Sequence, residues 1–362
     1  MKMGRVRLFV FLVFICVATA HSSLAESAGT LVYPRALHSA VLLKDGRVLI
    51  CGGQIAPDGA MIFTKTAEIY DPATRTWTRT GQMNIIRVRP GCVLLPDGRV
   101  LVAGSAISSH TAELYDPVTG VWTFTGRMHQ ERDPTLILLP TGKVLAAGGS
   151  DDVVSCELYD PATGTWSYTG SLNHKRLYQT TLLATGQVLA SGGIELPNGF
   201  PIRQSELYDP STGAWSDTAL EQFPRFFQQQ LLLPNGRVLV AGGETGNHGG
   251  TADIPRCEVY DPMAGNWNVV GSLATPRVLA SSSLLGDGKA LIAGGIDKSG
   301  QVTSSIEEYN PHTNNWSTPP FALATPRYYH TQTSLLDGSV LIAGGFIVGE
   351  IPVAEAEVFF DP

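Results

Sequence analysis

Short apolar runs follow tight-turn signals at regular intervals along this chain. In the first copy, residues 38–43 precede an Asp-Gly turn at 45–46, and the apolar run 47–51 follows it and ends at Gly52. An Asp-Gly turn between two such runs predicts a β-hairpin. The glycine that ends the second run recurs seven times: Gly52, Gly104, Gly148, Gly192, Gly242, Gly294 and Gly344.

Each copy continues with a second pair of strands. In the first copy, Glu68 and Tyr70 alternate with apolar residues, Asp71 opens a turn, and Trp77 follows. We therefore expect four antiparallel strands per copy, lettered a to d in chain order. The tryptophan of strand d recurs in six copies, which hold all tryptophans of the chain: Trp77, Trp122, Trp166, Trp215, Trp267 and Trp316. A single four-stranded unit cannot bury both of its faces, so the copies are expected to stack around an axis.

This combination of double glycine, tyrosine and tryptophan resembles the kelch repeat. The resemblance covers residues 29–362 and implies an all-β, seven-bladed β-propeller with four antiparallel strands per blade. The seventh copy ends at 361–362 without a tryptophan. Gly29 stands six residues before Arg35, as Gly81 stands before Arg87, so residues 26–32 are expected to supply the missing strand. The alternative is a chain truncated relative to a longer parent, with an exposed sheet edge.

The N-terminus has the pattern of an export signal. Residues 1–7 carry three positive charges, and residues 8–20 are apolar. The apolar stretch is too short for an ordinary membrane-spanning helix and fits a signal peptide. Cleavage is expected after Ala20 or Ala25, with Ala25 preferred, and an uncleaved anchor is the alternative. We therefore expect a signal peptide at 1–25, one propeller at 26–362, no membrane span in the mature chain, and a secreted or periplasmic location.

The charge and the cysteine content of the chain argue against several kinds of partner and site. Only 16% of the residues are charged, and the net charge is −7. A nucleic-acid partner is not expected, because such proteins need a basic surface. The four cysteines beyond the signal segment are scattered, which argues against a disulfide framework or a clustered zinc site. Their simplest interpretation is as small buried hydrophobic residues in a monomeric protein.

Arginine and glutamate recur in register with the repeat. A glutamate precedes the tyrosine of strand c, and a structural Arg–Glu pair in each blade is expected. The arginines that precede strand a are Arg35, Arg87, Arg132, Arg176, Arg225, Arg277 and Arg327. In contrast, Arg89, Arg203 and Arg256 stand outside this pattern.

The loops predict which face binds a ligand. The a–b and c–d turns are short and similar, whereas the b–c and d–a loops vary and meet at the opposite end of the propeller. Variable loops on a rigid scaffold usually carry binding residues. The ligand candidates on this face are Arg89, Tyr178, Arg203, His248, Arg256, Tyr329 and His330. Strand a is expected to line a solvated channel with mostly uncharged polar residues, at Ser39, Gly91, Thr135, Gln179, Gln229, Ser281 and Thr331.

Two enzyme families offer an alternative to a binding module. Tyr178, Tyr329 and His330 lie in sequences similar to the copper-site strands of the galactose oxidase kelch domain. That resemblance implies a metal site, but Asp133 stands where the family places a cross-linked cysteine, and the family's remaining histidine comes from a following domain. These three residues are therefore weak metal candidates, and no cofactor is expected, copper being the alternative.

The second family is the sialic acid mutarotases, exported kelch propellers that would use a glutamate and an arginine for acid–base work. Glu195 with Arg203 or Arg89 could serve here. The sequence contains no nucleophile elbow, HExxH, P-loop or GxGxxG motif, and no catalytic residue is assigned. We expect an exported propeller that binds an unidentified protein or glycan through its b–c and d–a loop face. The alternative is a sugar-active enzyme, either mutarotase-like or a degenerate copper oxidase.

Overall fold

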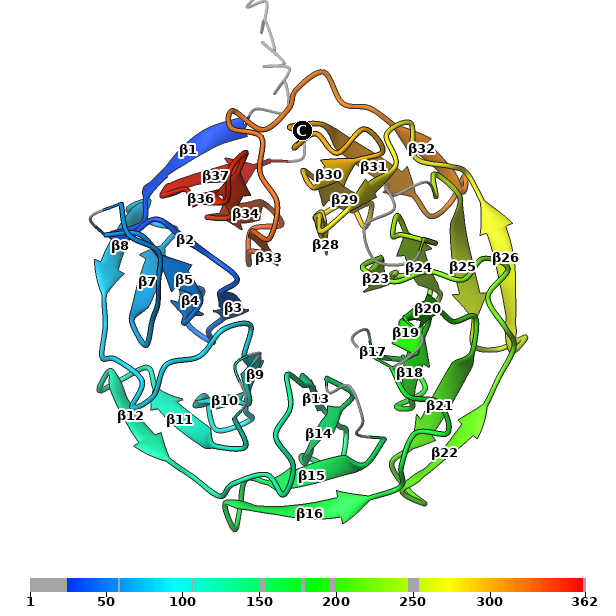
Figure 1. Cartoon of the computed structure of the whole chain (residues 1–362), viewed down its shortest axis with the longest axis horizontal. Helices are drawn as coiled ribbons and strands as arrows, with labels where there is room; N and C mark the ends of the chain where they lie inside the picture. The colour runs from blue at the N-terminus through cyan, green and yellow to red at the C-terminus, as the bar shows by residue number, and fades with distance from the viewer. Residues whose placement is uncertain are drawn as a thin grey trace, which may run out of the picture.

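The computed structural model describes residues 25–360, apart from 58, 106, 108, 150–153, 177–179, 196–198 and 247–253. Seven four-stranded antiparallel sheets surround a central opening (Figure 1). The described residues form strands and no helix, and so include no helix that could cross a membrane. The predicted all-β, seven-bladed propeller is confirmed. The predicted signal peptide, residues 1–25, lies outside the described part except for Ala25.

The innermost strand of each blade is strand a, which in six blades begins at the residue predicted to line the channel; in blade 4 that residue, Gln179, lies outside the described part. These strands are β3 (Ser39–Leu42), β9 (Gly91–Leu94), β13 (Thr135–Leu138), β17 (Thr180–Leu182), β23 (Gln229–Leu232), β28 (Ser281–Leu284) and β33 (Thr331–Ser334). The b strands are β4 (Val48–Cys51), β10 (Val100–Ala103), β14 (Val144–Ala147), β18 (Val188–Ser191), β24 (Val238–Ala241), β29 (Ala290–Ala293) and β34 (Val340–Ala343). Every residue of the b strands is buried.

The outer half of each blade consists of strands c and d. The c strands are β7 (Ala67–Asp71), β11 (Ala112–Asp116), β15 (Cys156–Asp160), β21 (Ser205–Asp209), β25 (Cys257–Asp261), β31 (Ile306–Asn310) and β37 (Glu355–Phe359). The d strands are β8 (Thr76–Arg79), β12 (Val121–Phe124), β16 (Thr165–Thr169), β22 (Ala214–Asp217), β26 (Asn266–Val270), β32 (Asn315–Ser317) and β1 (Ala25–Thr30).

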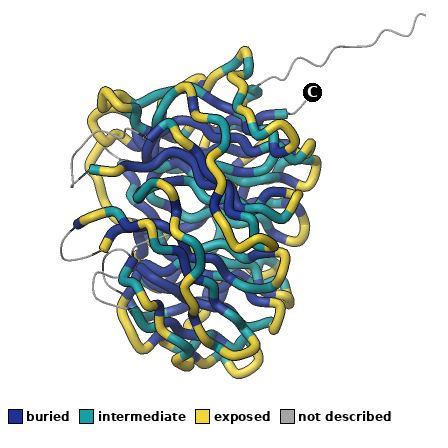
Figure 2. The backbone as a smooth tube through the Cα atoms, turned by 90° about the vertical axis from the view of Figure 1, so that its right-hand side faces the viewer, coloured by how far each residue is buried: buried dark blue, intermediate teal, exposed yellow. Residues whose placement is uncertain are grey.

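Short two-residue strands occur in the loops at one end of the propeller. They are β2 (Arg35–Ala36), β5 (Gln54–Ile55), β6 (Ile62–Phe63), β19 (Ile194–Glu195), β20 (Phe200–Pro201), β27 (Arg277–Val278), β30 (Ile296–Asp297), β35 (Phe346–Ile347) and β36 (Ile351–Pro352). Figure 2 shows the buried interior between two exposed ends.

Hydrophobic side chains fill the seams between blades. Leu49 and Cys51 of β4, for example, pack with Val100 and Val102 of β10. The alternate residues of the same strand, Val48 among them, pack on the opposite side against blade 7. Because successive side chains of a strand point to opposite faces, each b strand contributes to two seams. The core is therefore a set of seven seams rather than one central cluster.

The N-terminal strand completes blade 7. β1 pairs antiparallel with β37, with Ala25 opposite Phe359 and Glu26 opposite Val358. In Figure 1 the first strand lies beside the last, so both ends of the chain share one blade. The predicted closure is confirmed, with the strand at 25–30 instead of 26–32. A register shift between Ser27 and Thr30 ends the regular pairing early.

All seven predicted Arg–Glu pairs are present and buried. The nitrogen–oxygen distances run from 2.5 Å for Arg35–Glu68 to 3.2 Å for Arg132–Glu157. Glu68 also accepts a hydrogen bond from the N–H of Val32, at 2.6 Å, so the pair holds the d–a loop as well. These ion pairs connect strand c to the start of strand a and fix the loops that lead to the channel mouth.

Candidate ligand site at the channel mouth

Five residues at the channel mouth adopt left-handed backbone conformations. Each lies two residues after the paired arginine of its blade. They are Leu37, Arg89, Phe227, Leu279 and Tyr329, with φ values of 48–56°. Positive φ is uncommon for residues other than glycine and costs about 1–3 kcal/mol at each position. Its recurrence in five blades shows that the repeat enforces this conformation.

Backbone hydrogen bonds join four of these residues around the channel. The N–H of Arg89 donates to the Leu37 carbonyl at 2.8 Å, and the N–H of Leu37 donates to the Tyr329 carbonyl at 3.3 Å. The N–H of Tyr329 donates in turn to the Leu279 carbonyl at 3.1 Å. We call these four residues the mouth belt. It crosses three consecutive seams and holds the side chains of blades 6, 7, 1 and 2 in fixed positions.

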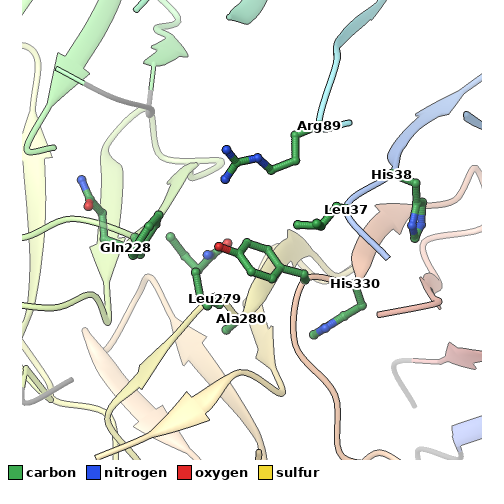
Figure 3. A pocket seen from close by; sticks show the side chains of 10 residues that line it. Leu37, His38, Arg89, Gln228, Leu279, Ala280 and His330 are labelled. Carbon is green, nitrogen blue, oxygen red and sulfur yellow. The ribbon is translucent and has the colours of Figure 1, made fainter. Parts of the chain in front are cut away.

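The mouth belt borders a cavity of about 210 Å³. The lining residues are Leu37, His38, Arg89, Phe227, Gln228, Gln229, Leu279, Ala280, Tyr329 and His330. Figure 3 shows the Arg89 side chain reaching into the space that Gln228 and Leu37 border. A neighbouring hollow of about 300 Å³ shares His38 and Arg89 and extends along blades 2 and 3. Apolar surfaces and polar groups therefore face the same small space.

Arg89 is the cation of this site and is held by Asp133. Its guanidinium lies 3.1 Å from a carboxylate oxygen of Asp133, which is almost buried. Tyr329 lines the same cavity as Arg89. Burial raises the pKa of Tyr329, while Arg89 acts in the opposite direction. The phenol is therefore protonated at neutral pH and can donate a hydrogen bond to a ligand.

The two histidines of the cavity lie at its margin. An added methyl group on Gly294 would come 2.8 Å from Cε1 of His330, so this ring packs against the neighbouring blade. His38 stands in the same relation to Gly344, also at 2.8 Å, and its Nε2 lies 2.9 Å from the Thr331 hydroxyl. Burial lowers the pKa of His330 to about 3 and the pKa of His38 well below its usual value. Both imidazoles are therefore neutral at physiological pH.

The other predicted site residues lie elsewhere. Arg203 is exposed, and its Nε donates to the Glu221 carbonyl at 2.5 Å. Arg256 is exposed and lies over the Phe223 ring, 4.7 Å from its centroid. Neither arginine lines the cavity. Glu195 is exposed in β19 and is also absent from the lining. Tyr178 and His248 lie outside the described residues.

Thus the structure brings together Arg89, Tyr329 and His330. Sequence reasoning did not identify Asp133 and Phe227 as ligand-site residues. The sequence did contain a signal for these two residues. Asp133 and Phe227 each stand two residues before the first residue of strand a, as Arg89 does in its own blade.

One possible cation cluster occurs among the described residues. Ligand atoms of His174, Glu206 and Asp217 all lie within 4.8 Å of one another. Glu206 is already paired with Arg176 at 2.7 Å. None of these side chains lines the channel-mouth cavity, so this cluster does not contribute to the candidate site.

The described residues do not fit the copper site that the galactose oxidase resemblance implies. Asp133, in the place of the cross-linked cysteine, forms an ion pair with Arg89. The positively charged Arg89 lines the same cavity as Tyr329 and His330, which disfavours a metal cation there. His330 is 6% exposed and packs against the preceding blade. We derive no chemical step through copper at this site.

Comparison with known proteins supports the repeat and the fold. The kelch-motif family matches residues 34–84 and 280–320. Kelch-like protein 21 from Bos taurus and from Homo sapiens is 32% identical over 65 residues, which covers 18% of this chain and 11% of theirs. The chain thus matches only about a tenth of the length of these curated relatives.

A solved structure is similar over nearly the whole chain. A copper-bound fungal alcohol oxidase of the AA5 family superposes with a TM-score of 0.74 and 17% sequence identity, covering 94% of this chain and 77% of that protein. At this identity the likeness concerns the fold. The kelch-motif matches in two segments and this superposition agree with the observed fold, a β-propeller built from kelch-like repeats.

Proposed function

We propose that this chain is an exported binding module that holds a glycan unit at the channel mouth. The cavity of about 210 Å³ accommodates a ligand of roughly the size of one sugar ring. Phe227, Leu279 and Tyr329 offer apolar surface to the C–H faces of such a ring, and Gln228 and Gln229 offer amide groups to its hydroxyls. Small-molecule sites combine apolar walls with a few placed polar groups in this way.

The paired charges favour a neutral ligand. The Arg89 guanidinium supplies donors in a fixed plane, and the Asp133 carboxylate 3.1 Å away supplies acceptors. Two adjacent sugar hydroxyls both donate and accept, so they match this pair. Because Asp133 offsets the charge of Arg89, the pair has little attraction for an anionic ligand. The single observation that carries the proposal is this ion pair, in which Arg89 lines the cavity with Tyr329 and Asp133 lines the neighbouring hollow.

The mouth belt prepares the site before the ligand arrives. Left-handed backbone and hydrogen bonds across the seams fix Arg89, Leu279 and Tyr329 in place. A site that is already ordered loses less entropy on binding. We expect the unliganded and liganded forms to differ little at these residues.

A glycan array followed by calorimetric titration tests the proposal. Tyr329→Phe and Arg89→Lys should each weaken binding of the best monosaccharide at least about tenfold. Arg47→Lys, at an a–b turn of the opposite face, is the matched control and should bind as the wild type does. Absence of any glycan binding, or wild-type affinity in the Arg89 variant, would overturn the proposal. Binding on a parallel protein array alone would favour a protein partner.

The remaining loop residues concern longer ligands. Arg203, Arg256 and His248 are proposed to contact an oligosaccharide beyond the unit held in the cavity. Alanine at each position should weaken an oligosaccharide and leave the monosaccharide affinity unchanged. Equal affinity of every variant for both ligands would remove these residues from the proposed binding face.

The export part of the proposal has its own test. The pattern of residues 1–25 supports cleavage before Glu26 and delivery to a secreted or periplasmic location. The intact mass of protein recovered from the extracytoplasmic fraction should correspond to a chain that begins near Glu26. Recovery of a chain that retains residues 1–25 would contradict cleavage.

A further inference from the structure

Two cysteines face each other in the seam between blades 1 and 2. Cys51 is the last residue of β4, and Cys92 is the second residue of β9. Cys51 belongs to the hydrophobic cluster of this seam, and Cys92 and Leu94 pack against the same cluster. Strand alternation therefore directs both thiols into one seam. In the structure neither cysteine is part of a disulfide bond.

The repeat shows that side chains at these two positions meet. Ser191 and Gln230 occupy the same positions in the seam between blades 4 and 5, and the Ser191 hydroxyl donates to Oε1 of Gln230 at 2.9 Å. Cys51 and Cys92 likewise belong to one packed cluster in the seam between blades 1 and 2. In five other blades the position of Cys51 holds alanine: Ala103, Ala147, Ala241, Ala293 and Ala343.

The two thiols differ in accessibility. Cys92 is half-buried and lines the hollow of about 300 Å³ beside the channel, next to Gly91. Gly91 has no side chain, whereas the corresponding residues Ser39 and Thr135 do. Cys51 is fully buried behind it. Because Cys92 is the less buried of the two residues, we expect a small reagent to react with Cys92 first and Cys51 to react second.

We propose that Cys51 and Cys92 form a disulfide between blades 1 and 2 by exchange with a small organic disulfide. The Cys92 sulfur attacks the reagent, which breaks its S–S bond, forms a mixed disulfide and releases one thiol. The Cys51 sulfur then attacks the sulfur of Cys92 and releases the second thiol. Two cysteine thiols are oxidised, one external disulfide is reduced to two thiols, and both cysteine protons leave on them.

The rate should depend on pH. The neighbouring Cys51 thiol, together with burial, raises the pKa of the Cys92 thiol well above its usual value. The thiolate is the nucleophile in disulfide exchange, so the reaction should be slow at neutral pH and faster in alkaline solution. Once formed, the bond would hold the first two blades together near the seam that β1 closes.

Cystamine is a suitable small disulfide for the test. The whole protein, purified under reducing conditions, is incubated with cystamine at pH 7 and pH 9 without sugar. We expect a non-reduced peptide map to show Cys51 joined to Cys92, with loss of two hydrogens and faster reaction at pH 9. Cross-linking raises the melting temperature by about 5 °C, because it constrains the unfolded chain.

Alanine variants separate the two steps. Cys51→Ala places the residue of five other blades at this position and should leave Cys92 as a mixed disulfide with cysteamine. Cys156→Ala and Cys257→Ala are controls and should form the same cross-link as the wild type. The proposal is overturned if wild-type Cys51 and Cys92 remain alkylatable after oxidation, if the mixed disulfide persists, or if either cysteine pairs elsewhere. None of these outcomes depends on glycan binding.

Discussion

The indole Nε1 of Trp77 donates a hydrogen bond to the carbonyl of Ala28, at 2.9 Å. In the next blade the indole of Trp122 donates to the Gly81 carbonyl at 2.8 Å, and Gly81 follows strand d of the preceding blade. β1 therefore gives blade 1 the contact that an ordinary strand d gives its successor. The N-terminal strand both completes blade 7 and supports blade 1.

Removal of residues 26–33 should open the ring at this point. The deletion takes away most of β1, exposes the edge of β37 and leaves the Trp77 indole without its acceptor. We expect a melting temperature at least about 5 °C lower and association through the free edge. Differential scanning calorimetry and size-exclusion chromatography measure these effects.

A point variant in the same strand is the control for that deletion. Glu26→Gln removes only the exposed ion pair with Arg75 and should change stability by less than about 0.5 kcal/mol. An unchanged melting temperature and a monomeric elution volume after the deletion would show that β1 is not needed for closure.

The buried Arg–Glu pairs should be costly to break. Glu113→Gln leaves the fully buried Arg87 guanidinium without its carboxylate partner, 3.0 Å away in the wild type. We expect a loss of about 3 kcal/mol in the free energy of unfolding, because a buried charge loses its partner. Asp97→Asn, which breaks an exposed pair with Arg99, should cost less than about 0.5 kcal/mol. Equal effects of the two substitutions in urea denaturation would contradict this account.

The fold could be predicted from the sequence because its determinants repeat. The spacing of glycine, tyrosine and tryptophan predicted seven blades, and the register of arginine and glutamate predicted the buried pairs. Closure by the N-terminal strand followed from Gly29 and Arg35, which are in register with later copies. Each of these features depends on contacts within one blade or between neighbouring blades, and the period of the repeat encodes them.

The site was harder to predict because it depends on departures from the repeat. Arg89 was recognised as a residue outside the repeat pattern. Its partner Asp133 lies in the next blade, and the sequence analysis compared Asp133 only with the cross-linked cysteine of the galactose oxidase family. The contact of Cys51 with Cys92 also crosses a seam. A repeat alignment shows which residues are unusual, whereas the packing of neighbouring blades decides which of them meet.

Copper chemistry gives a further prediction. We expect the purified protein to hold no stoichiometric copper and to produce no hydrogen peroxide from a sugar alcohol, because Arg89 and Asp133 occupy the site beside Tyr329. Elemental analysis and a peroxidase-coupled assay, each repeated after addition of one equivalent of Cu(II), measure this. One tightly bound copper per chain together with peroxide production would reverse the prediction and favour an oxidase.

Glu221 is a buried carboxylate at a position where the repeat places a large apolar residue. The corresponding residues are all buried: Leu31, Met83, Met128, Leu172, Leu273 and Leu323. Glu221 lies 3.5 Å from Nε of Arg225, whose guanidinium is already paired with Glu258 at 2.7 Å. Burial raises the pKa of Glu221 to about 8. The folded protein therefore retains this proton at pH values where the unfolded chain has lost it.

The stability contribution of Glu221 should fall as the pH rises. It is fully present below about pH 4.5, the ordinary pKa of a glutamate in an unfolded chain, and is lost as the pH increases through about 8. Glu221→Leu restores the apolar residue type that the other blades have at this position. The variant leaves Nε of Arg225 unpaired, which is tolerated, because Nε of Arg35 and of Arg87 also lacks a hydrogen-bond partner. We expect this variant to gain about 1–4 kcal/mol in the free energy of unfolding at pH 9 and less at pH 5.

Glu221→Gln is the control. It removes the titrating group but keeps a polar side chain, so the difference in stability between Glu221→Gln and Glu221→Leu should not vary with pH. Urea denaturation of the three proteins at both pH values measures these differences, and an equal gain for Glu221→Leu at pH 5 and pH 9 would show that the carboxylate does not titrate in this range.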